Sequence, residues 1–216
     1  MMRQGLRLSV LVTGLVASSL LGGCITPGPA TRFYLLTPAT EAVPAPILRQ
    51  PAAPDRAAQR LTVVITDIRL PTYLDRPQIV TRDSGNRLEF SEIDQWGGHL
   101  REDMGRVLAI NLGRVLAGDR VVAAPHAATV PPDFRVEVDI LAFERQPGGR
   151  VALSAQWVIT RGNDGKLHAG SAGSFSGAAL GDSATYDTLV GSMSAVYGEL
   201  ARAIARGIRP HVAVGS

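Results

Sequence analysis

The chain of 216 residues contains a single cysteine, Cys24, and this limits how its fold can be stabilised. One thiol cannot close a disulfide within the chain, and it is too few for a cysteine-based zinc site. The histidines form no pair whose spacing would bring two metal ligands onto one helix face; they are His99, His126, His168 and His211. We therefore expect no cofactor or metal, and packing of apolar side chains must hold the fold together.

The residues before Cys24 have the three parts of a bacterial export signal. Arg3 and Arg7 form a cationic start, and an apolar stretch of 14 residues follows from Leu8 to Leu21. About 20 apolar residues are needed to cross a bilayer as a helix, so the stretch is too short to remain as an anchor. The ending Leu-Gly-Gly-Cys resembles the lipobox, where a signal peptidase cleaves before the cysteine and the sulfur receives a diacylglycerol.

We therefore predict that residues 1–23 are a lipoprotein signal peptide and that Cys24 is the lipid attachment point. The alternative is an ordinary secretory signal beside a chance cysteine. Each buried methylene contributes about 0.8 kcal/mol, so two or more acyl chains hold a protein firmly on its membrane. Ile25 follows the cysteine where lipoproteins kept in the inner membrane usually carry Asp. Resemblance to this sorting rule favours the periplasmic face of the outer membrane.

The charge of the mature chain argues against a nucleic-acid partner. Of 22 basic residues, two leave with the signal peptide, so 20 face 19 acidic residues and the net charge falls from +3 to about +1. No basic run with interleaved aromatic residues remains, and such a run is the usual footprint of nucleic-acid binding.

Proline spacing divides the mature chain into two parts. Residues 24–60 are predicted to be an acylated N-terminus, a short edge strand at Arg32–Leu36 and a Pro/Ala-rich connection, because its prolines are too close for helix or central strand. Residues 61–216 are predicted to be one globular α/β domain.

Six segments of this domain have strand character. The nearly continuous apolar run Leu61–Leu70 is typical of a strand covered on both faces. A turn at Asp83–Asn86 indicates a hairpin between short strands at 78–82 and 87–90. Three alternating segments separated by glycine turns indicate an antiparallel meander; they begin at Phe134, Val151 and Leu167.

Two segments have helical periodicity. The first runs from Trp96 to Leu116, with Asn111 interrupting its apolar stripe, and the second from about Ser183 to Ile208, with Asp182 as its expected cap. The pattern predicts a single compact α/β domain, with a mixed, largely antiparallel sheet and two long helices packed on it.

The sequence offers little for catalysis. Gly191–Ala195 lies inside the second apolar-periodic helix, where the strained turn of a nucleophilic serine is not expected. Gly170–Ser174 has the composition of a phosphate loop but lies within strand alternation and lacks the Gly-Lys-Ser/Thr ending. We predict a non-enzymatic protein, with a periplasmic hydrolase as a remote alternative.

The segment between Pro71 and Pro77 is different, because two prolines hold its backbone extended and keep it out of the flanking elements. One interpretation is a structural connection in which Asp75 caps the segment or pairs with Arg76 or Arg82. The other is an anchor for a partner or neighbouring subunit, since aromatic residues on rigid loops are favoured hot spots. The candidate interface residues are Tyr73, Leu74, Asp75, Arg76, Pro77 and Trp96.

The run from Leu70 to Arg82, preceded by Phe33–Leu36 and followed by Trp96, resembles the PqiC/YmbA family of auxiliary lipoproteins of ABC-type intermembrane transport systems. The family usually has an acidic residue and a proline after the tryptophan, whereas Gly97, Gly98 and His99 intervene here. The resemblance implies a compact α/β domain that assembles into homo-oligomeric rings and has no enzymatic role.

The same resemblance implies partners: an MCE-domain periplasmic protein that threads a hydrophobic passage across the periplasm, and inner-membrane transport components. The lipoprotein would be the outer-membrane end of this lipid transport system. A second hypothesis is a lipoprotein chaperone or assembly factor for an outer-membrane or secretion component, with the same tether and no lipid pathway.

Overall fold

The computed structural model of the chain describes residues 28–39, 60–116, 119–123, 131–181 and 183–209. Contacts divide the chain into two units, Met1–Ala30 and Thr31–Ser216. Of the first unit only residues 28–30 are described, and they form neither helix nor strand. The predicted signal peptide, Cys24 and the connection at 40–59 lie outside the described residues.

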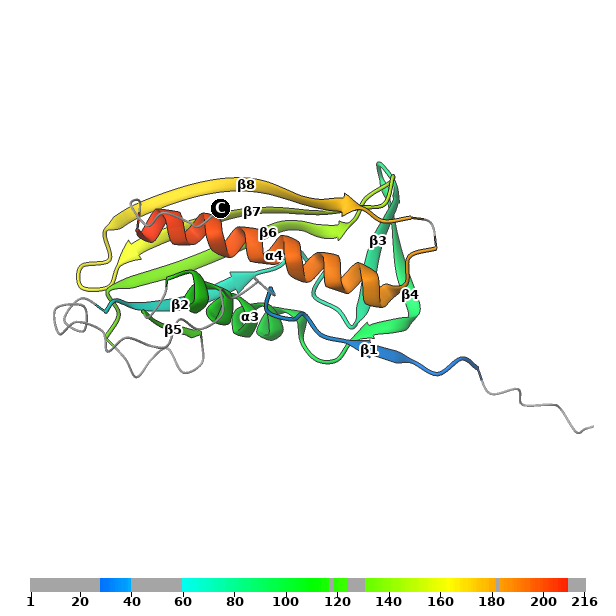
Figure 1. The fold of residues 1–216 in the computed structure, drawn as a ribbon, viewed down its shortest axis with the longest axis horizontal. Coiled ribbons are helices and arrows are strands. Elements are labelled where there is room, and N and C mark those ends of the chain that lie inside the picture. The colour runs from blue at the N-terminus through cyan, green and yellow to red at the C-terminus, as the bar shows by residue number, and fades with distance from the viewer. Residues whose placement is uncertain (1–27, 40–59, 117–118, 124–130, 182, 210–216) are drawn as a thin grey trace, which may run out of the picture. The chain divides into compact units, whose positions relative to one another are not determined.

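The described part of the second unit is one mixed sheet with two helices on it, which confirms the predicted fold class (Figure 1). Helix α4 packs on β6, β7 and β8, and α3 packs beside α4 on β2 and β5. The strands are β1 (Arg32–Tyr34), β2 (Thr62–Arg69), β3 (Gln78–Ser84), β4 (Arg87–Trp96), β5 (Arg120–Ala123), β6 (Phe134–Arg145), β7 (Arg150–Arg161) and β8 (Leu167–Ala179); the helices are α3 (Leu100–Val115) and α4 (Tyr186–Ile208).

The sheet runs in the order β1-β4-β3-β6-β2-β5, and β7 and β8 extend it from the other edge of β6. The longest ladders are antiparallel and belong to the meander β6-β7-β8. The hairpin β3-β4 is also antiparallel, and the sequence predicted both the meander and the hairpin. The tight turn from β6 to β7 requires glycine, because Gly149 has φ 84° and an added Cβ would lie 2.1 Å from the Leu180 carbonyl oxygen.

Strand β2 pairs in parallel with both β5 and β6. Its consecutive residues Val63, Val64 and Ile65 are all buried, so both faces of the strand are covered, as the apolar run predicted. Strand β5 was not predicted. Its four residues are too few to show periodicity, and pairing with β2 is what holds them extended.

Both helices begin later than predicted. Trp96 is the last residue of β4, where its N–H donates to the Pro77 carbonyl at 2.7 Å, and α3 begins at Leu100. The four-residue spacing between Trp96 and Leu100 imitates a helix turn in sequence, although a strand supplies the first and a helix the second. Helix α4 is capped by Thr185, whose hydroxyl accepts from the Thr188 N–H at 3.3 Å, so the assignment of Asp182 as the cap was wrong.

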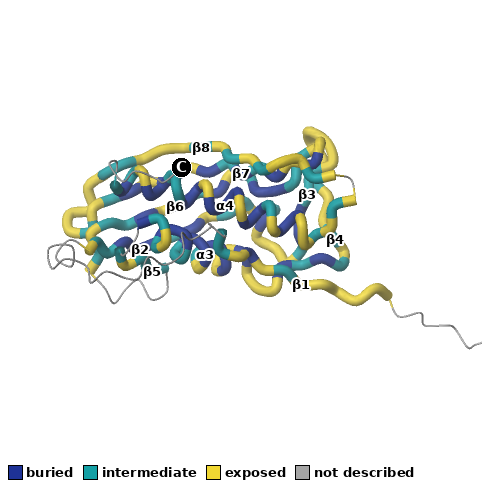
Figure 2. Tube along the Cα trace, in the orientation of Figure 1, coloured by how far each residue is buried: buried dark blue, intermediate teal, exposed yellow. Residues whose placement is uncertain are grey.

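The core lies between the sheet and the inner faces of the two helices, which Figure 2 shows as the dark blue segments. Tyr197 of α4 is fully buried against Phe143 of β6, and its hydroxyl donates to the Met104 carbonyl of α3 at 3.1 Å. Burial raises the pKa of the Tyr197 phenol well above its ordinary value. Neither α3 nor α4 is long and apolar enough to cross a membrane.

Candidate functional site

The proline-bounded loop, residues Pro71–Pro77, connects β2 to β3 and is fixed at both ends. Near its start the Leu74 N–H donates to the Pro71 carbonyl at 2.9 Å, which closes a tight turn. At its end the Pro77 carbonyl accepts from the Trp96 N–H at 2.7 Å, which joins the loop to the end of β4. The loop is therefore a fixed surface rather than a free connection.

A buried carboxylate holds the loop from below. Glu144 of β6 is 0% exposed. Its Oε2 accepts from the Tyr73 hydroxyl at 2.8 Å and the Phe143 N–H at 2.9 Å. Its Oε1 accepts from Arg82 Nε and from Gln146 Nε2, both at 3.0 Å. Burying a carboxylate is costly unless it is paired and hydrogen-bonded, and these donors meet that condition.

The Tyr73 side chain is therefore fixed by a hydrogen bond within the monomer. Desolvation, followed by the hydrogen bond to Glu144, raises the pKa of the Tyr73 phenol well above its ordinary value, so the hydroxyl stays protonated as a donor. Arg82 pairs with Glu144 at 2.9 Å. The interpretation of the sequence that paired Arg82 with Asp75 was therefore wrong.

Two of the predicted interface residues are not on the surface. Leu74 is 3% exposed and Trp96 is 5% exposed, and both belong to the hydrophobic core. The prediction that these two side chains contact a partner directly was wrong, because a side chain that packs inside the monomer has no area left for a partner. They fix the position of the loop instead.

The loop presents Asp75, Arg76 and Pro77 to solvent. Asp75 accepts from Arg101 Nη2 of α3 at 2.7 Å, an exposed ion pair of small energetic weight. The guanidinium carbon of Arg76 lies 4.3 Å from the centroid of the Phe90 ring, a cation–π contact with β4. The rigid loop therefore exposes one acidic residue, one basic residue and one proline to solvent.

A second feature was anticipated only in part: the edge strand predicted at Arg32–Leu36 forms as β1. It belongs to a longer segment, residues Arg32–Ala39, here called the strap, which is bonded to the body along its length. Strand β1 begins the strap and pairs in parallel with the end of β4. Beyond it, backbone N–H groups of the strap donate to side chains of both helices: Leu36 to Asp103 at 2.7 Å, Thr37 to Ser194 at 3.1 Å and Ala39 to Asn111 at 3.0 Å.

The strap also explains the polar residue in the stripe of α3. Asn111 is buried and accepts from the strap instead of packing against the sheet. Arg114 of the same helix donates to the Ala39 carbonyl at 2.8 Å. Leu36 of the strap is itself buried in the core, so this segment is a structural part of the domain.

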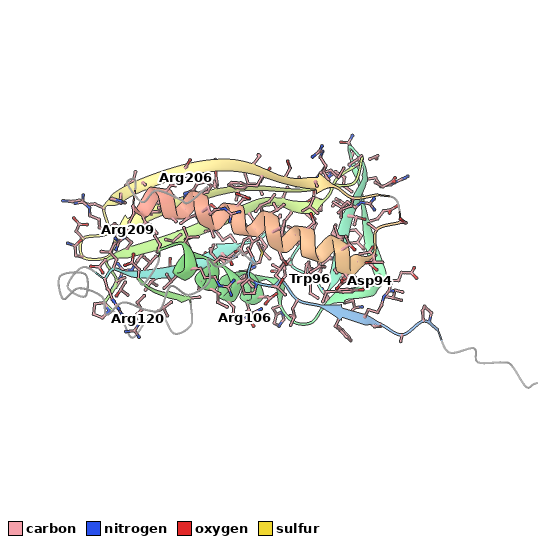
Figure 3. All side chains as sticks on the ribbon, viewed as in Figure 1. Asp94, Trp96, Arg106, Arg120, Arg206 and Arg209 are labelled. Carbon is pink, nitrogen blue, oxygen red and sulfur yellow. The ribbon has the colours of Figure 1, made fainter. Side chains whose placement is uncertain are left out.

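Asp94 fastens the strap where it begins, beside Trp96 (Figure 3). Its carboxylate accepts from Arg32 Nε at 2.8 Å, from the Tyr34 hydroxyl at 3.0 Å and from the Ser91 hydroxyl at 3.0 Å. Burial alone would raise the pKa of Asp94, but the hydrogen bonds from Arg32, Ser91 and Tyr34 outweigh it and lower the pKa below its ordinary value.

The described residues show no arrangement that suggests catalysis. Ser194 is buried, and its hydroxyl donates to the Val190 carbonyl at 2.9 Å and accepts from the strap, so it acts as a packing and hydrogen-bonding residue. A groove of about 450 Å³ borders the strap, β8 and α4; its charged residues Glu199 and Arg202 pair with each other. No group of three or more potential metal ligands occurs among the described residues.

The match to a family model decides the classification. The model of the ABC-type transport auxiliary lipoprotein component matches residues 45–205. The chain belongs to this family. The match confirms the resemblance to PqiC/YmbA-like lipoproteins, and membership is consistent with a membrane-anchored, periplasmic transport component.

Solved structures support the fold. An uncharacterised protein, 18% identical, aligns with a TM-score of 0.65 over 83% of this chain and 99% of its own. A protein from Xanthomonas campestris, 12% identical, aligns with a TM-score of 0.58 over 82% of this chain and 90% of its own. At these identities the likeness shows the fold alone. No curated protein matches this chain in sequence.

Proposed function

We propose that the protein is a non-enzymatic auxiliary component of an MCE-type intermembrane lipid transport system, anchored by Cys24 to the periplasmic face of the outer membrane. The observation that carries the proposal is the family match over residues 45–205. The lipobox-like sequence before Cys24 and the Ile25 that follows it support the anchor and the choice of membrane.

In this proposal the acyl chains confine the domain near one leaflet, where a partner arrives from the opposite membrane. Confinement raises the effective concentration of the two surfaces, so weak contacts per subunit suffice. A homo-oligomeric ring would add these contacts together. The partners are an MCE-domain periplasmic protein and the inner-membrane components that act with it.

The proline-bounded loop is the proposed contact surface for the partner or a neighbouring subunit. Asp75, Arg76 and Pro77 supply the exposed contacts, and the buried side chains of Leu74 and Trp96 keep the loop in one shape. A loop that is already rigid loses little conformational entropy on binding, which favours affinity.

The test is affinity purification of the native lipoprotein from detergent-extracted membranes, with identification of the associated proteins and lipids. Replacing both Asp75 and Arg76 by Ser should reduce recovery of the partner without unfolding the domain, since both residues are exposed. The matched control replaces Asp83 and Arg87 by Ser, which form an exposed ion pair at the β3–β4 turn, and should leave recovery unchanged.

Recovery of an MCE-domain protein with the wild-type chain supports the transport proposal. Recovery of one unrelated client without phospholipid favours the chaperone hypothesis. If the Asp75/Arg76 variant recovers as much partner as the Asp83/Arg87 control, the loop is not the contact surface. The transport proposal would still stand. The mass of the extracted assembly tests the ring.

A further inference from the structure

The strap exposes two large apolar side chains at the point where the tether enters the domain. Phe33 is 67% exposed and Leu35 is 52% exposed. They alternate with Tyr34 and Leu36, which point inward: Tyr34 to Asp94 and the Tyr186 ring, and Leu36 into the core. Alternation along an extended segment therefore places both exposed side chains on the outward face.

The length of the tether keeps these side chains near the lipid anchor. Six residues, 25–30, separate Cys24 from the start of the folded unit at Thr31. An extended chain spans at most 3.3–3.6 Å per residue, so Phe33, nine positions after Cys24, stays within about 30 Å of the acylated residue. This distance is comparable to the thickness of one bilayer core.

The two exposed side chains lie on a strand whose neighbouring loop carries exposed glycines. The neighbouring loop contains Gly97 and Gly98, both exposed, and an added Cβ at Gly97 would lie 3.3 Å from Leu35 Cδ2. The Leu35 side chain therefore lies against Gly97, whereas nothing lies within 4 Å of a Cβ built at Gly98. The pairing of Arg32 with Asp94 and the backbone bond from the Gly97 N–H to the Tyr34 carbonyl hold the strand in place.

We propose that Phe33 and Leu35 insert into the lipid interface beside acylated Cys24, so that the β1 end of the domain rests on the bilayer. The inference builds on the anchor of the proposed function. A phenyl ring and an isobutyl group on a firm backbone are typical of segments that lie in a membrane interface. A lipid surface requires no matching pocket, and this end of the domain is always close to one.

Such docking gives the domain a defined orientation. A tether alone, whose residues 25–30 carry no charge, would not fix the orientation of the domain above the membrane. Two inserted side chains at its base remove most of that freedom and present the remaining surface to the periplasm in a constant direction.

The experiment uses the lipidated mature protein, which begins at Cys24, in vesicles of phosphatidylethanolamine and phosphatidylglycerol. Because the sulfur of Cys24 is consumed by the acyl modification, Phe33→Cys or Leu35→Cys introduces the one reactive thiol, which is labelled with a polarity-sensitive fluorophore. The matched control is Leu167→Cys at the start of β8, a residue that is 68% exposed and distant from the tether in sequence. Both test positions are exposed, so the variants keep the core intact.

Labels at positions 33 and 35 should shift to shorter emission wavelengths and be quenched by nitroxide-bearing lipids severalfold more than the label at 167. Equal quenching at all three positions in protein that floats with the vesicles overturns the docking and leaves the anchor standing. A blue shift without lipid quenching also overturns it and points to a second copy as the cover. Protein that fails to float refutes the anchor and the docking together.

Discussion

Replacing Glu144 by glutamine is expected to destabilise the domain by about 2–4 kcal/mol and to loosen the proline-bounded loop. The reason is that only hydrogen-bond donors face the Glu144 carboxylate. Each oxygen accepts two hydrogen bonds, one pair from Tyr73 and Phe143 and the other from Arg82 and Gln146. A glutamine amide replaces one acceptor oxygen by an NH₂ group, which meets donors in either orientation.

The magnitude follows from the less costly orientation. With the NH₂ group toward Tyr73, the phenol can turn and accept, but the buried Phe143 N–H loses its partner, at about 1–3 kcal/mol. Arg82 then bonds to a neutral oxygen instead of a carboxylate, which loses about 1 kcal/mol more. The sum is a large part of the 5–15 kcal/mol that typically stabilises a domain.

The assay is urea unfolding of the mature chain with Cys24→Ser, analysed by linear extrapolation. Glu137→Gln is the matched control, because Glu137 lies on the same strand and is exposed; it should change the free energy of unfolding by no more than about 0.5 kcal/mol. Hydrogen exchange of residues 71–77 should accelerate only in Glu144→Gln. Equal stability of the two variants would show that the buried carboxylate does not hold the loop.

Asp94→Asn should destabilise the domain by about 1–2 kcal/mol at neutral pH, with the half-exposed Arg32 contributing little. Since the pKa of Asp94 is lowered from its ordinary 3.8, its stabilisation is present above that value and lost as pH falls further, so unfolding free energies of variant and wild type should converge in acid. Gly198→Ala places a Cβ 2.6 Å from that of Ala39 and should destabilise by about 1–2 kcal/mol in urea unfolding. Gly191→Ala on the same helix meets nothing within 4 Å and should stabilise by up to about 1 kcal/mol.

The elements whose structure depends on neighbours in sequence were predicted well. The alternation of apolar and polar residues from Phe134 onward, together with the glycine turns, was enough to predict the meander. The apolar run around Val64 was enough to predict a strand buried on both faces. Strand β5 was not predicted, because its four residues are too few to show a strand pattern. They are held extended by pairing with β2, whose Thr62 lies 58 positions before its partner Arg120.

The position of the proline-bounded loop was predicted, but the burial and partners of its side chains were not. The two prolines marked the loop, yet no local signal distinguishes the buried Leu74 from the exposed Asp75, because their environments are set by distant elements. The Glu144 network joins residues 62 and 71 positions apart. Two traces of the strap were visible in the sequence: the predicted edge strand at Arg32–Leu36, and Asn111, since a polar residue in an apolar stripe signals a specific partner.

The strap has a consequence for where the protein can be cut. The family match starts at residue 45, whereas the strap ends at Ala39. A shortened chain that starts at the family boundary would lack Leu36 and the donors to Asp94 and Asp103. It would retain every predicted helix and all but one strand, while two buried carboxylates, Asp94 and Asp103, would lose the donors that the strap supplies. The outer limit of the homologous region is thus not the limit of the independently stable body, and fragments for purification or fusion should begin before Thr31.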